Sequence, residues 1–354
     1  MESHDRSREA IHGVFEDERR FLLPSIEKRL MARVYICRNW FPEELQRISA
    51  IHETRIWMGE GNPPREILLQ EIADVEGLLC LGSDRIDREV IERARRLRVI
   101  SSFSNGTDNI DVAAATARRI PIGHPPFVLT ETTADLAFAL LLTAARRIVE
   151  GDAFVRKGLW DKSSHLDLPG VDVNHATLGI VGLGRIGAQV AKRAKAFHMR
   201  VLYHSRRRQF EMENLLQIEY SADLHRLLAL SDFIVLCASL NPQSRHLIGP
   251  REFAAMKPTA ILVNIARGAL IDSTALYEAL KNRRILRAAI DVTDPEPIPL
   301  DHPLLTLENL IIVPHIGSAV PATRRKMMAM AVDHLLMGLR GERIPFCVNP
   351  EVYE

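Results

Sequence analysis

From Arg33 onward, short apolar runs alternate along the chain with segments whose apolar residues recur at helical spacing. The runs Val34–Cys37, Gly77–Gly82 and Val99–Phe103 are typical of strands buried on both faces of a sheet. Strands that alternate in this way with helices predict a parallel sheet covered by helices on both sides. The pattern therefore predicts an α/β fold.

Further elements stand out in the same pattern. We expect a strand over 55–58, a long apolar helix over 130–147, a short helix over 253–258 and a final helix over 322–339. The change in composition after Leu129 predicts a domain boundary. Residues 1–30 are rich in charge and lack a signal-peptide pattern, so we expect them to form a flexible or short helical extension.

One β-α-β unit carries a nucleotide-binding pattern. The strand 178–181 is followed by Gly182-x-Gly184-x-x-Gly187, a helical pattern and a second strand, 201–203. Gly182 allows a tight turn, Gly184 lets the backbone approach a pyrophosphate, and Gly187 lets the helix pack on the strand. The free amides at the helix N-terminus attract phosphate. This glycine pattern also occurs by chance, but the flanking strand and helix favour dinucleotide binding over a purely structural turn.

The residues after the second strand indicate which dinucleotide binds. A site for NAD usually carries an acidic residue there, which binds the ribose 2′-hydroxyl. This chain has Ser205, Arg206 and Arg207 instead, and their hydroxyl and guanidinium groups suit the 2′-phosphate of NADP. We therefore favour NADPH as the cofactor, with NADH as an alternative. The other interpretation is that the arginines belong to a solvated loop.

The composition of the chain limits which classes of protein it can belong to. The chain has 354 residues, a formal charge of +1 and four cysteines. Its length allows two domains, and its balanced charge gives no indication of a nucleic-acid or membrane partner. The scattered cysteines are typical of reduced thiols, and the sequence shows neither metal-ligand spacing nor an apolar segment as long as a membrane span. We expect a cytoplasmic protein without a metal site.

Polar residues follow several predicted strands, at the edge where parallel sheets bind ligands. Asn105 and Gly106 follow one strand in a turn whose amides could bind a carboxylate, although an ordinary turn would have the same sequence pattern. Arg267, Glu296 and His315 follow three later strands. Hydride transfer to a carbonyl needs a proton donor, a cation for the substrate carboxylate and a group that tunes the donor. His315, Arg267 and Glu296 suit these roles in that order, although each alone has an ordinary structural interpretation.

Six motifs along the chain are informative together: VLTETTADLAFALLLTAARR, LGIVGLGRIG, SDFIVLCASL, AILVNIARGALID, AAIDVTDPEP and IIVPHIGSA. They resemble the D-2-hydroxyacid dehydrogenase family, and most closely its glyoxylate reductase/hydroxypyruvate reductase branch. The resemblance extends from about Met31 to the C-terminus. It implies that Arg267 anchors the substrate carboxylate, that Glu296 is the partner of the histidine, and that His315 is the proton donor.

The resemblance also implies an organisation of the chain. It implies two Rossmann-like, doubly wound parallel-sheet domains with a cleft between them: a substrate domain of residues 31–130 and 319–354, and an inserted cofactor domain of residues 131–318. It further implies a homodimer. The cofactor contacts expected from the glycine pattern and from the resemblance are Gly182, Leu183, Gly184, Arg185, Ile186, Gly187, Ser205, Arg206, Arg207, Ile265, Ala266, Asp291 and Gly317. The expected substrate contacts are Asn105, Gly106 and Arg267.

The chain departs from the family pattern at positions that bear on the substrate. Asn105 stands where the substrate loop usually has valine, and its polar side chain would favour a hydroxylated acid such as hydroxypyruvate. Phe127 lies in a segment that is commonly an Asn-Thr-Pro turn and makes it more apolar. Trp160 is followed by Asp161-Lys162-Ser163-Ser164, without the second tryptophan of some reductases.

We predict NADPH-dependent reduction of glyoxylate or hydroxypyruvate to the D-2-hydroxy acid. One alternative keeps the fold but changes the substrate to another 2-oxo acid or to phosphite. A second alternative is a nucleotide-sensing binding protein that resembles the corepressors with this fold.

Overall fold

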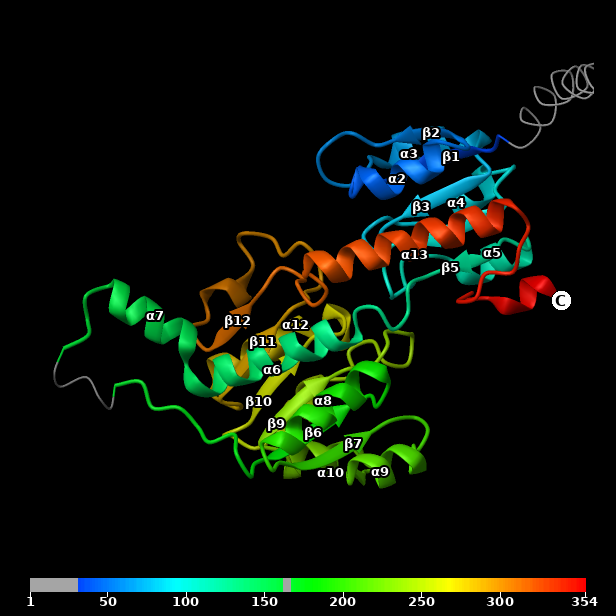
Figure 1. The fold of residues 1–354 in the computed structure, drawn as a ribbon. Helices are drawn as coiled ribbons and strands as arrows, with labels where there is room; N and C mark the ends of the chain where they lie inside the picture. Colours follow the sequence, from blue (N-terminus) through cyan, green and yellow to red (C-terminus); the bar gives the residue numbers. More distant parts are fainter. Residues whose placement is uncertain (1–30, 162–166) are drawn as a thin grey trace, which may run out of the picture. The chain divides into compact units, whose positions relative to one another are not determined.

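The structure is a computed structural model that describes residues 31–161 and 167–354. The chain divides into two compact units (Figure 1). The first unit comprises the chain up to Pro125 together with Arg325–Glu354, and the second comprises Pro126–Arg324. The extension predicted over 1–30 and the residues Lys162, Ser163 and Ser164 lie outside the described residues.

The first unit is built on a five-stranded parallel sheet in the order β2-β1-β3-β4-β5. Its strands are β1 (Arg33–Ile36), β2 (Glu53–Ile56), β3 (Gly77–Cys80), β4 (Val99–Ser102) and β5 (Ile122–Gly123). Its helices are α2 (Pro42–Ser49), α3 (Arg65–Glu71), α4 (Arg88–Arg93), α5 (Val112–Ala117) and the 3-10 turns η1 (Ile72–Asp74) and η5 (Pro350–Tyr353).

The last helix, α13 (Pro321–Leu339), packs on the sheet of the first unit. The Ser101 hydroxyl, on β4, donates a 2.7 Å hydrogen bond to the Ala331 carbonyl of α13. A Cβ on Gly338 would lie 2.4 Å from the Val99 side chain, so the helix approaches the sheet closely at this point. The C-terminal segment is thereby part of the first core although it is distant in sequence.

The second unit is built on a seven-stranded parallel sheet in the order β12-β11-β10-β9-β6-β7-β8. Its strands are β6 (Thr177–Val181), β7 (Arg200–His204), β8 (Glu219–Tyr220), β9 (Phe233–Leu236), β10 (Ile261–Asn264), β11 (Arg287–Ile290) and β12 (Leu310–Ile312). Its helices are α6 (Thr130–Arg146), α7 (Ile148–Arg156), α8 (Arg185–Ala196), α9 (Phe210–Leu216), α10 (Leu224–Leu230), α11 (Pro250–Ala255), α12 (Ser273–Lys281) and the 3-10 turns η3 (Gly268–Leu270) and η4 (Pro303–Thr306).

Helices cover both faces of this sheet, as Figure 1 shows. One apolar cluster joins α6 and α8 to the sheet, with Leu141 and Val190 fully buried. A second cluster joins α10, α11 and α12 to it, with Leu228 and Phe253 buried. The strands are buried on both sides because each face carries helices. The prediction of two parallel-sheet α/β units is confirmed.

Several local predictions differ from the structure. The strand predicted over 55–58 is β2 (Glu53–Ile56), because its partner β1 ends at Ile36, which pairs with Ile56. The helix predicted over 253–258 is α11, which starts at Pro250 because the Glu252 carboxylate accepts a hydrogen bond from the Gly249 amide. The helices predicted over 130–147 and 322–339 are confirmed as α6 and α13 within one residue at each end.

In residues 31–161 and 167–354, no helix has the length and apolar character needed to cross a membrane.

Candidate active site

The glycine loop follows β6, where the order of the strands in the second sheet reverses. Gly182 has a φ of 98°, and a Cβ there would lie 2.6 Å from the Ala238 amide nitrogen. A Cβ on Gly187 would lie 2.3 Å from the Gly182 carbonyl oxygen, whereas one on Gly184 would meet no described atom within 4 Å. The turn therefore requires Gly182 and Gly187, and Gly184 leaves open the space that a pyrophosphate needs.

The helix α8 begins directly after this loop. Leu183 is buried in the core and Ile186 packs against it, so both side chains are used in packing. The backbone amides of the first turn have no partners within the helix, and they and the positive end of the helix dipole suit an anion. Arg185, the first residue of α8, has an exposed side chain.

Ser205, Arg206 and Arg207 follow β7, which pairs with β6 and brings them beside the glycine loop. The Gly182 amide donates to the His204 carbonyl at 2.8 Å, which joins the two strand ends. The Ser205 hydroxyl donates to the Arg207 carbonyl at 2.6 Å. The basic turn therefore lies at the sheet edge where doubly wound folds bind nucleotides.

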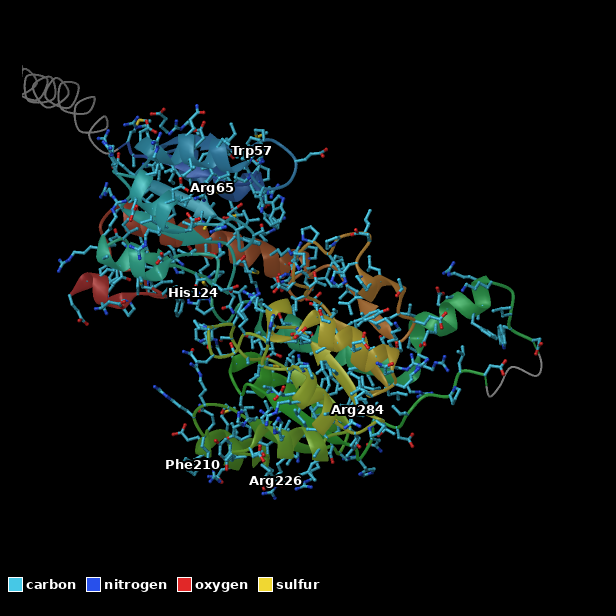
Figure 2. The ribbon with its side chains drawn as sticks, turned by 180° about the vertical axis from the view of Figure 1, so that it is seen from behind. Trp57, Arg65, His124, Phe210, Arg226 and Arg284 are labelled. Atoms are coloured by element: carbon cyan, nitrogen blue, oxygen red, sulfur yellow. The ribbon has the colours of Figure 1, made fainter. Side chains whose placement is uncertain are left out.

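A neighbouring network holds this basic turn. Arg208 donates two hydrogen bonds, at 2.9 and 2.8 Å, to the carboxylate of Glu213. The Tyr203 hydroxyl donates to the same carboxylate at 2.7 Å and accepts a hydrogen bond from the Gln209 amide at 2.8 Å. The hydrogen bonds from Arg208 and Tyr203 lower the pKa of Glu213 to about 2. The Arg208 guanidinium carbon also lies 4.5 Å from the ring centroid of Phe210, which lies at the edge of the second unit in Figure 2.

Arg206 and Arg207 differ from Arg208 in their contacts. Both side chains are exposed, and within the described part of the chain neither has a hydrogen bond or ion pair. Arg208 is neutralised by Glu213. Two of the three consecutive guanidinium groups thus remain available to an anion. Sequence reasoning missed the pairing of Glu213, because it depends on how α9 folds back over β7.

Arg267 lies in a tight turn after β10. The Asn264 side chain donates to the Arg267 carbonyl at 2.9 Å and accepts from the Ala266 amide at 3.1 Å, so it fixes the turn that contains Ile265 and Ala266. The Arg267 guanidinium donates to the Ala266 carbonyl at 2.8 Å. A buried Asn264 therefore determines the position of Arg267, a role that sequence reasoning missed.

Glu296 and His315 come from the loops after β11 and β12. The Glu296 Oε1 atom lies 2.6 Å from the His315 Nδ1 atom, and both side chains are partly exposed. Burial acts to raise the pKa of Glu296, but the hydrogen bond and charge of His315 outweigh it, and the Arg267 charge acts in the same direction as His315. The pKa of Glu296 is consequently below its usual value. The structure thus brings Arg267, Glu296 and His315 together at one edge of the sheet.

The turn at His315 is held by Asp291, a buried residue after β11. The Asp291 carboxylate accepts hydrogen bonds from the Ile316 amide at 2.6 Å and the Gly317 amide at 2.9 Å. His315 has a φ of 52°, and its amide donates to the Asp291 carbonyl at 2.9 Å. Thr133 donates to the Gly317 carbonyl at 3.2 Å. Burial raises the pKa of Asp291, while the two amide hydrogen bonds act to lower it.

Asn105 and Gly106 belong to the first unit, in the loop after β4. The His124 Nδ1 atom lies 2.8 Å from the Asn105 carbonyl oxygen, and His124 is labelled in Figure 2. The neighbouring Asn109 amide group donates to the Leu81 and Asp84 carbonyls. The loop is therefore tied to the ends of its neighbouring strands, where an ordered set of amides can bind an anion.

Comparison with known proteins identifies the family. A family model described as D-isomer specific 2-hydroxyacid dehydrogenase, NAD binding domain, matches residues 138–317. The glyoxylate reductase of Korarchaeum cryptofilum (strain OPF8) is 46% identical over 321 residues, which cover 90% of this chain and 96% of the relative. The chain belongs to the D-isomer specific 2-hydroxyacid dehydrogenase family. It is an NAD(P)-dependent dehydrogenase that reduces a 2-oxo acid to a 2-hydroxy acid.

Other similar proteins support this assignment to the dehydrogenase family. The glyoxylate reductase of Pyrococcus horikoshii is 44% identical over 324 residues, with coverage of 90% of this chain and 96% of its own. The crystal structure of a Thermus thermophilus protein matches with a TM-score of 0.83 and 44% identity, covering 89% of this chain and 99% of that chain. An NADPH-dependent glyoxylate/hydroxypyruvate reductase from Sinorhizobium meliloti, solved with NADP and malonate, matches with a TM-score of 0.80 and 27% identity, covering 90% and 98%.

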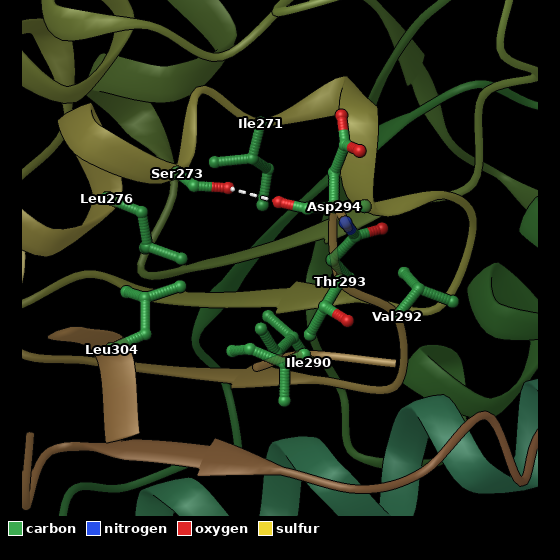
Figure 3. Close-up of a pocket in the computed structure, with 11 residues that line it drawn as sticks. Ile271, Ser273, Leu276, Ile290, Val292, Thr293, Asp294 and Leu304 are labelled. Atoms are coloured by element: carbon green, nitrogen blue, oxygen red, sulfur yellow. Dashed lines mark hydrogen bonds between the residues drawn. The ribbon is translucent and has the colours of Figure 1, made fainter. Parts of the chain in front are cut away.

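A small pocket of the dehydrogenase is lined by Gly268, in the loop after β10, and by Thr293 and Asp294, in the loop after β11 (Figure 3). Its lining is mostly apolar and includes Ile271, Leu276 and Leu304. It has room for about one water molecule, so we do not regard it as the substrate site.

Gly268 lies against the backbone of Thr293 at this pocket, since a Cβ on Gly268 would lie 2.0 Å from the Thr293 carbonyl group. The loops after β10 and β11 are therefore in direct backbone contact.

Over the described ranges, no group of three or more His, Cys, Asp or Glu residues could hold a metal ion.

Proposed function

We propose that this dehydrogenase reduces glyoxylate or hydroxypyruvate to the D-2-hydroxy acid with NADPH. The observation that carries the proposal is the 2.6 Å contact between Glu296 and His315, with the charge of Arg267 beside them. The relatives at 42–46% identity that bear the name glyoxylate reductase support the choice of a small substrate.

In the proposed reaction, these side chains act on the two polar ends of a 2-oxo acid. When bound, NADPH supplies a hydride to the carbonyl carbon. His315 donates a proton to the carbonyl oxygen as negative charge develops there. Glu296 stabilises the protonated imidazole through its negative charge. Arg267 binds the substrate carboxylate with a guanidinium fork, which orients the carbonyl.

The preference for NADPH rests on the basic turn after β7. Arg206 and Arg207 are exposed and have no hydrogen bond or ion pair within the described residues, whereas Arg208 is paired with Glu213. We propose that the first two bind the 2′-phosphate. The Ser205 hydroxyl, which donates to the Arg207 carbonyl in this structure, would turn to donate to the same phosphate. The turn Ser205–Arg208 contains no acidic residue that could bind a ribose 2′-hydroxyl, which supports NADPH over NADH.

We propose the first unit as the substrate domain and the second as the cofactor domain. In this proposal the amides at Asn105 and Gly106 bind the substrate carboxylate. The Asn105 side chain would then form a hydrogen bond with the 3-hydroxyl of hydroxypyruvate, which glyoxylate lacks. The remaining candidates, Ile265, Ala266, Asp291 and Gly317, would border the nicotinamide.

We also propose that the enzyme is a homodimer and that α7 contributes to the interface. None of the residues of α7 is buried, and in Figure 1 the helix extends away from the sheet of its own unit. Large apolar side chains on it and just after it are exposed. They are Ile148, Val149, Val155, Leu159 and Trp160. A cluster of this kind is typical of a surface that is covered by a partner.

Steady-state kinetics test the proposal directly. We would measure kcat/KM for glyoxylate, hydroxypyruvate and pyruvate, each with NADPH and with NADH. We expect high values for the first two acids with NADPH. Tight binding of NADPH without turnover of any 2-oxo acid would contradict the proposal and favour a nucleotide-sensing protein. Equal values with both cofactors would contradict the assignment of the basic turn.

A further inference from the structure

Phe127 combines a positive φ angle with an exposed aromatic ring. It lies in the second unit, just before α6, with a φ of 71°, and the residue is 55% exposed. The left-handed region is unfavourable for a residue with a bulky side chain, and an exposed aromatic ring gains little from burial. Strained conformations of this kind persist where the surrounding structure imposes them, and they are frequent at ligand sites. Phe127 thus combines a strained backbone with a partly exposed aromatic ring.

The ring of Phe127 lies beside a charged side chain of the nucleotide loop. The Arg185 guanidinium carbon lies 4.3 Å from the ring centroid, within the range of a cation–π contact. Arg185 is the first residue of α8, the helix whose N-terminus follows Gly182 and Gly184. Apart from this ring, Arg185 has no hydrogen bond or ion pair among the residues that the structure describes. The ring is thus the contact that holds this guanidinium.

A stacked guanidinium keeps its hydrogen-bonding capacity. Its N–H groups lie in the plane of the group, so an aromatic ring over the flat face would leave those donors free. A distance of 4.3 Å from the guanidinium carbon to the ring centroid is compatible with such a contact. Planar donor pairs match the oxygens of a phosphate, and the pyrophosphate of a dinucleotide binds at the start of such a helix. An aromatic partner therefore orients Arg185 without neutralising it, which a carboxylate would do.

We propose that Phe127 is a positioning residue for cofactor binding, whose ring holds the Arg185 guanidinium at the glycine loop with its N–H edge free for the pyrophosphate. This inference rests on the proposed binding of a nicotinamide dinucleotide at that loop. The pyrophosphate is common to NADPH and NADH, so Phe127 strengthens the binding of both. Its effect is thereby distinguished from that of Arg206 and Arg207, which concerns the 2′-phosphate alone.

The test compares substitutions that keep or remove the aromatic face. We would measure the Kd of NADPH and of NADH by nucleotide fluorescence for the wild type, Phe127→Tyr and Phe127→Leu. Phe127→Tyr keeps the ring, and we expect wild-type Kd values. Phe127→Leu keeps an apolar side chain but loses the ring, and we expect Kd to rise about two- to fivefold for both nucleotides.

A double-mutant cycle identifies the partner. In an Arg185→Ala background, Phe127→Leu should change neither Kd further, because the group that the ring holds is gone. Phe127→Gly separates binding from folding. Glycine tolerates a φ of 71° without strain, so we expect a thermal midpoint at or above that of the wild type together with weaker binding of both nucleotides.

Several results would overturn the inference. One is that Phe127→Leu binds both nucleotides with the Kd of the wild type. A second is that Phe127→Leu weakens the binding of NADPH but not of NADH. A third is that Phe127→Leu raises both Kd values in the Arg185→Ala background as much as it does in the wild type. In each case the wild type still binds nucleotide, so the proposed function survives. A wild-type protein that binds neither nucleotide would instead overturn the proposed function and this inference with it.

Discussion

The Glu296 Oε1 atom lies 2.6 Å from the His315 Nδ1 atom, so the carboxylate can stabilise positive charge on the imidazole. The effect on the carboxyl is visible in its pKa, which is lowered although burial acts in the opposite direction. The ordinary pKa of this carboxyl is 4.5. Because its pKa is lower in the folded state, the ionised carboxyl stabilises the folded protein at pH values above 4.5. This contribution is lost as the pH falls through the pKa of the folded state. The carboxyl of Glu296 is thus ionised throughout the neutral range.

We expect Glu296→Gln to lower kcat/KM for reduction by about tenfold or more. The amide can accept a hydrogen bond from the imidazole but carries no charge, so it does not stabilise positive charge on the imidazole as the carboxylate does. Steady-state kinetics with the 2-oxo acid and NADPH would measure the loss. Turnover like that of the wild type would contradict the role of Glu296.

We expect His315→Ala to lower kcat/KM by about 10²–10⁴-fold, because general acid catalysis is typically worth that much. Arg267→Ala should cause a loss of similar size. Arg267→Lys is the matched control for charge, since it keeps the cation but loses the planar fork. It should retain more activity than Arg267→Ala and raise the KM for the 2-oxo acid. Turnover like that of the wild type in His315→Ala or Arg267→Ala would refute the assignment.

Replacement of both Arg206 and Arg207 by Ala should weaken NADPH binding far more than NADH binding. Each charge-assisted hydrogen bond is worth about 1.5–3 kcal/mol, so we expect at least about a tenfold rise in the Kd of NADPH. The control is a double variant, Arg226→Ala with Arg251→Ala, which removes the same number of positive charges elsewhere. Arg226 is exposed on α10 and Arg251 is exposed on α11. Arg226 is labelled in Figure 2. Equal losses for the two nucleotides would exclude a 2′-phosphate site.

His334, on α13, predicts a pH dependence of stability. Burial lowers its pKa to about 4 from 6.5, and the charge of nearby His124 acts in the same direction. Its Nδ1 atom is buried and has no hydrogen-bond partner among the residues that the structure describes. The folded protein keeps this histidine neutral, whereas the unfolded chain binds a proton below about pH 6.5. Stability from this residue is therefore complete above that pH and falls between about pH 6.5 and about pH 4, by up to about 1.4 kcal/mol per pH unit.

The corresponding variant is His334→Gln, which has no titrating group at this position. We expect its free energy of unfolding to decrease less than that of the wild type between about pH 7.5 and about pH 5. Urea unfolding at the two pH values measures the difference. Equal decreases in the two proteins would show that His334 does not titrate on unfolding.

The β6-α8-β7 unit could be predicted from the sequence because three glycines, two apolar runs and one helical pattern agree there. The elements that were not predicted are short or depend on distant partners. The strand β8 has two residues and is defined by its pairing with β7. The helix α9 has seven residues, none of them buried. The exposed helix α7 likewise lacks the apolar stripe of a helix that packs on its own core.

For the candidate active site, the sequence predicted which side chains lie close together but not how their loops are held. Arg267, Glu296 and His315 follow strands, and parallel strands end at one edge, so their proximity follows from the fold class. The conformation of His315 does not follow from it. Its positive φ depends on the Asp291 carboxylate, which turns inward to two backbone amides. The sequence also did not predict that Arg206 and Arg207 can bind an anion while Arg208 is paired, because this depends on which arginine forms the ion pair with Glu213.

The backbone contact at Gly268 limits how this enzyme can be redesigned. No side chain fits between the loops after β10 and β11, since a Cβ would lie 2.0 Å from Thr293. Substitution there would separate the loop of Arg267 from that of Glu296. A directed-evolution library aimed at new acids should therefore keep position 268 fixed and place its diversity at Asn105, whose loop belongs to the other unit.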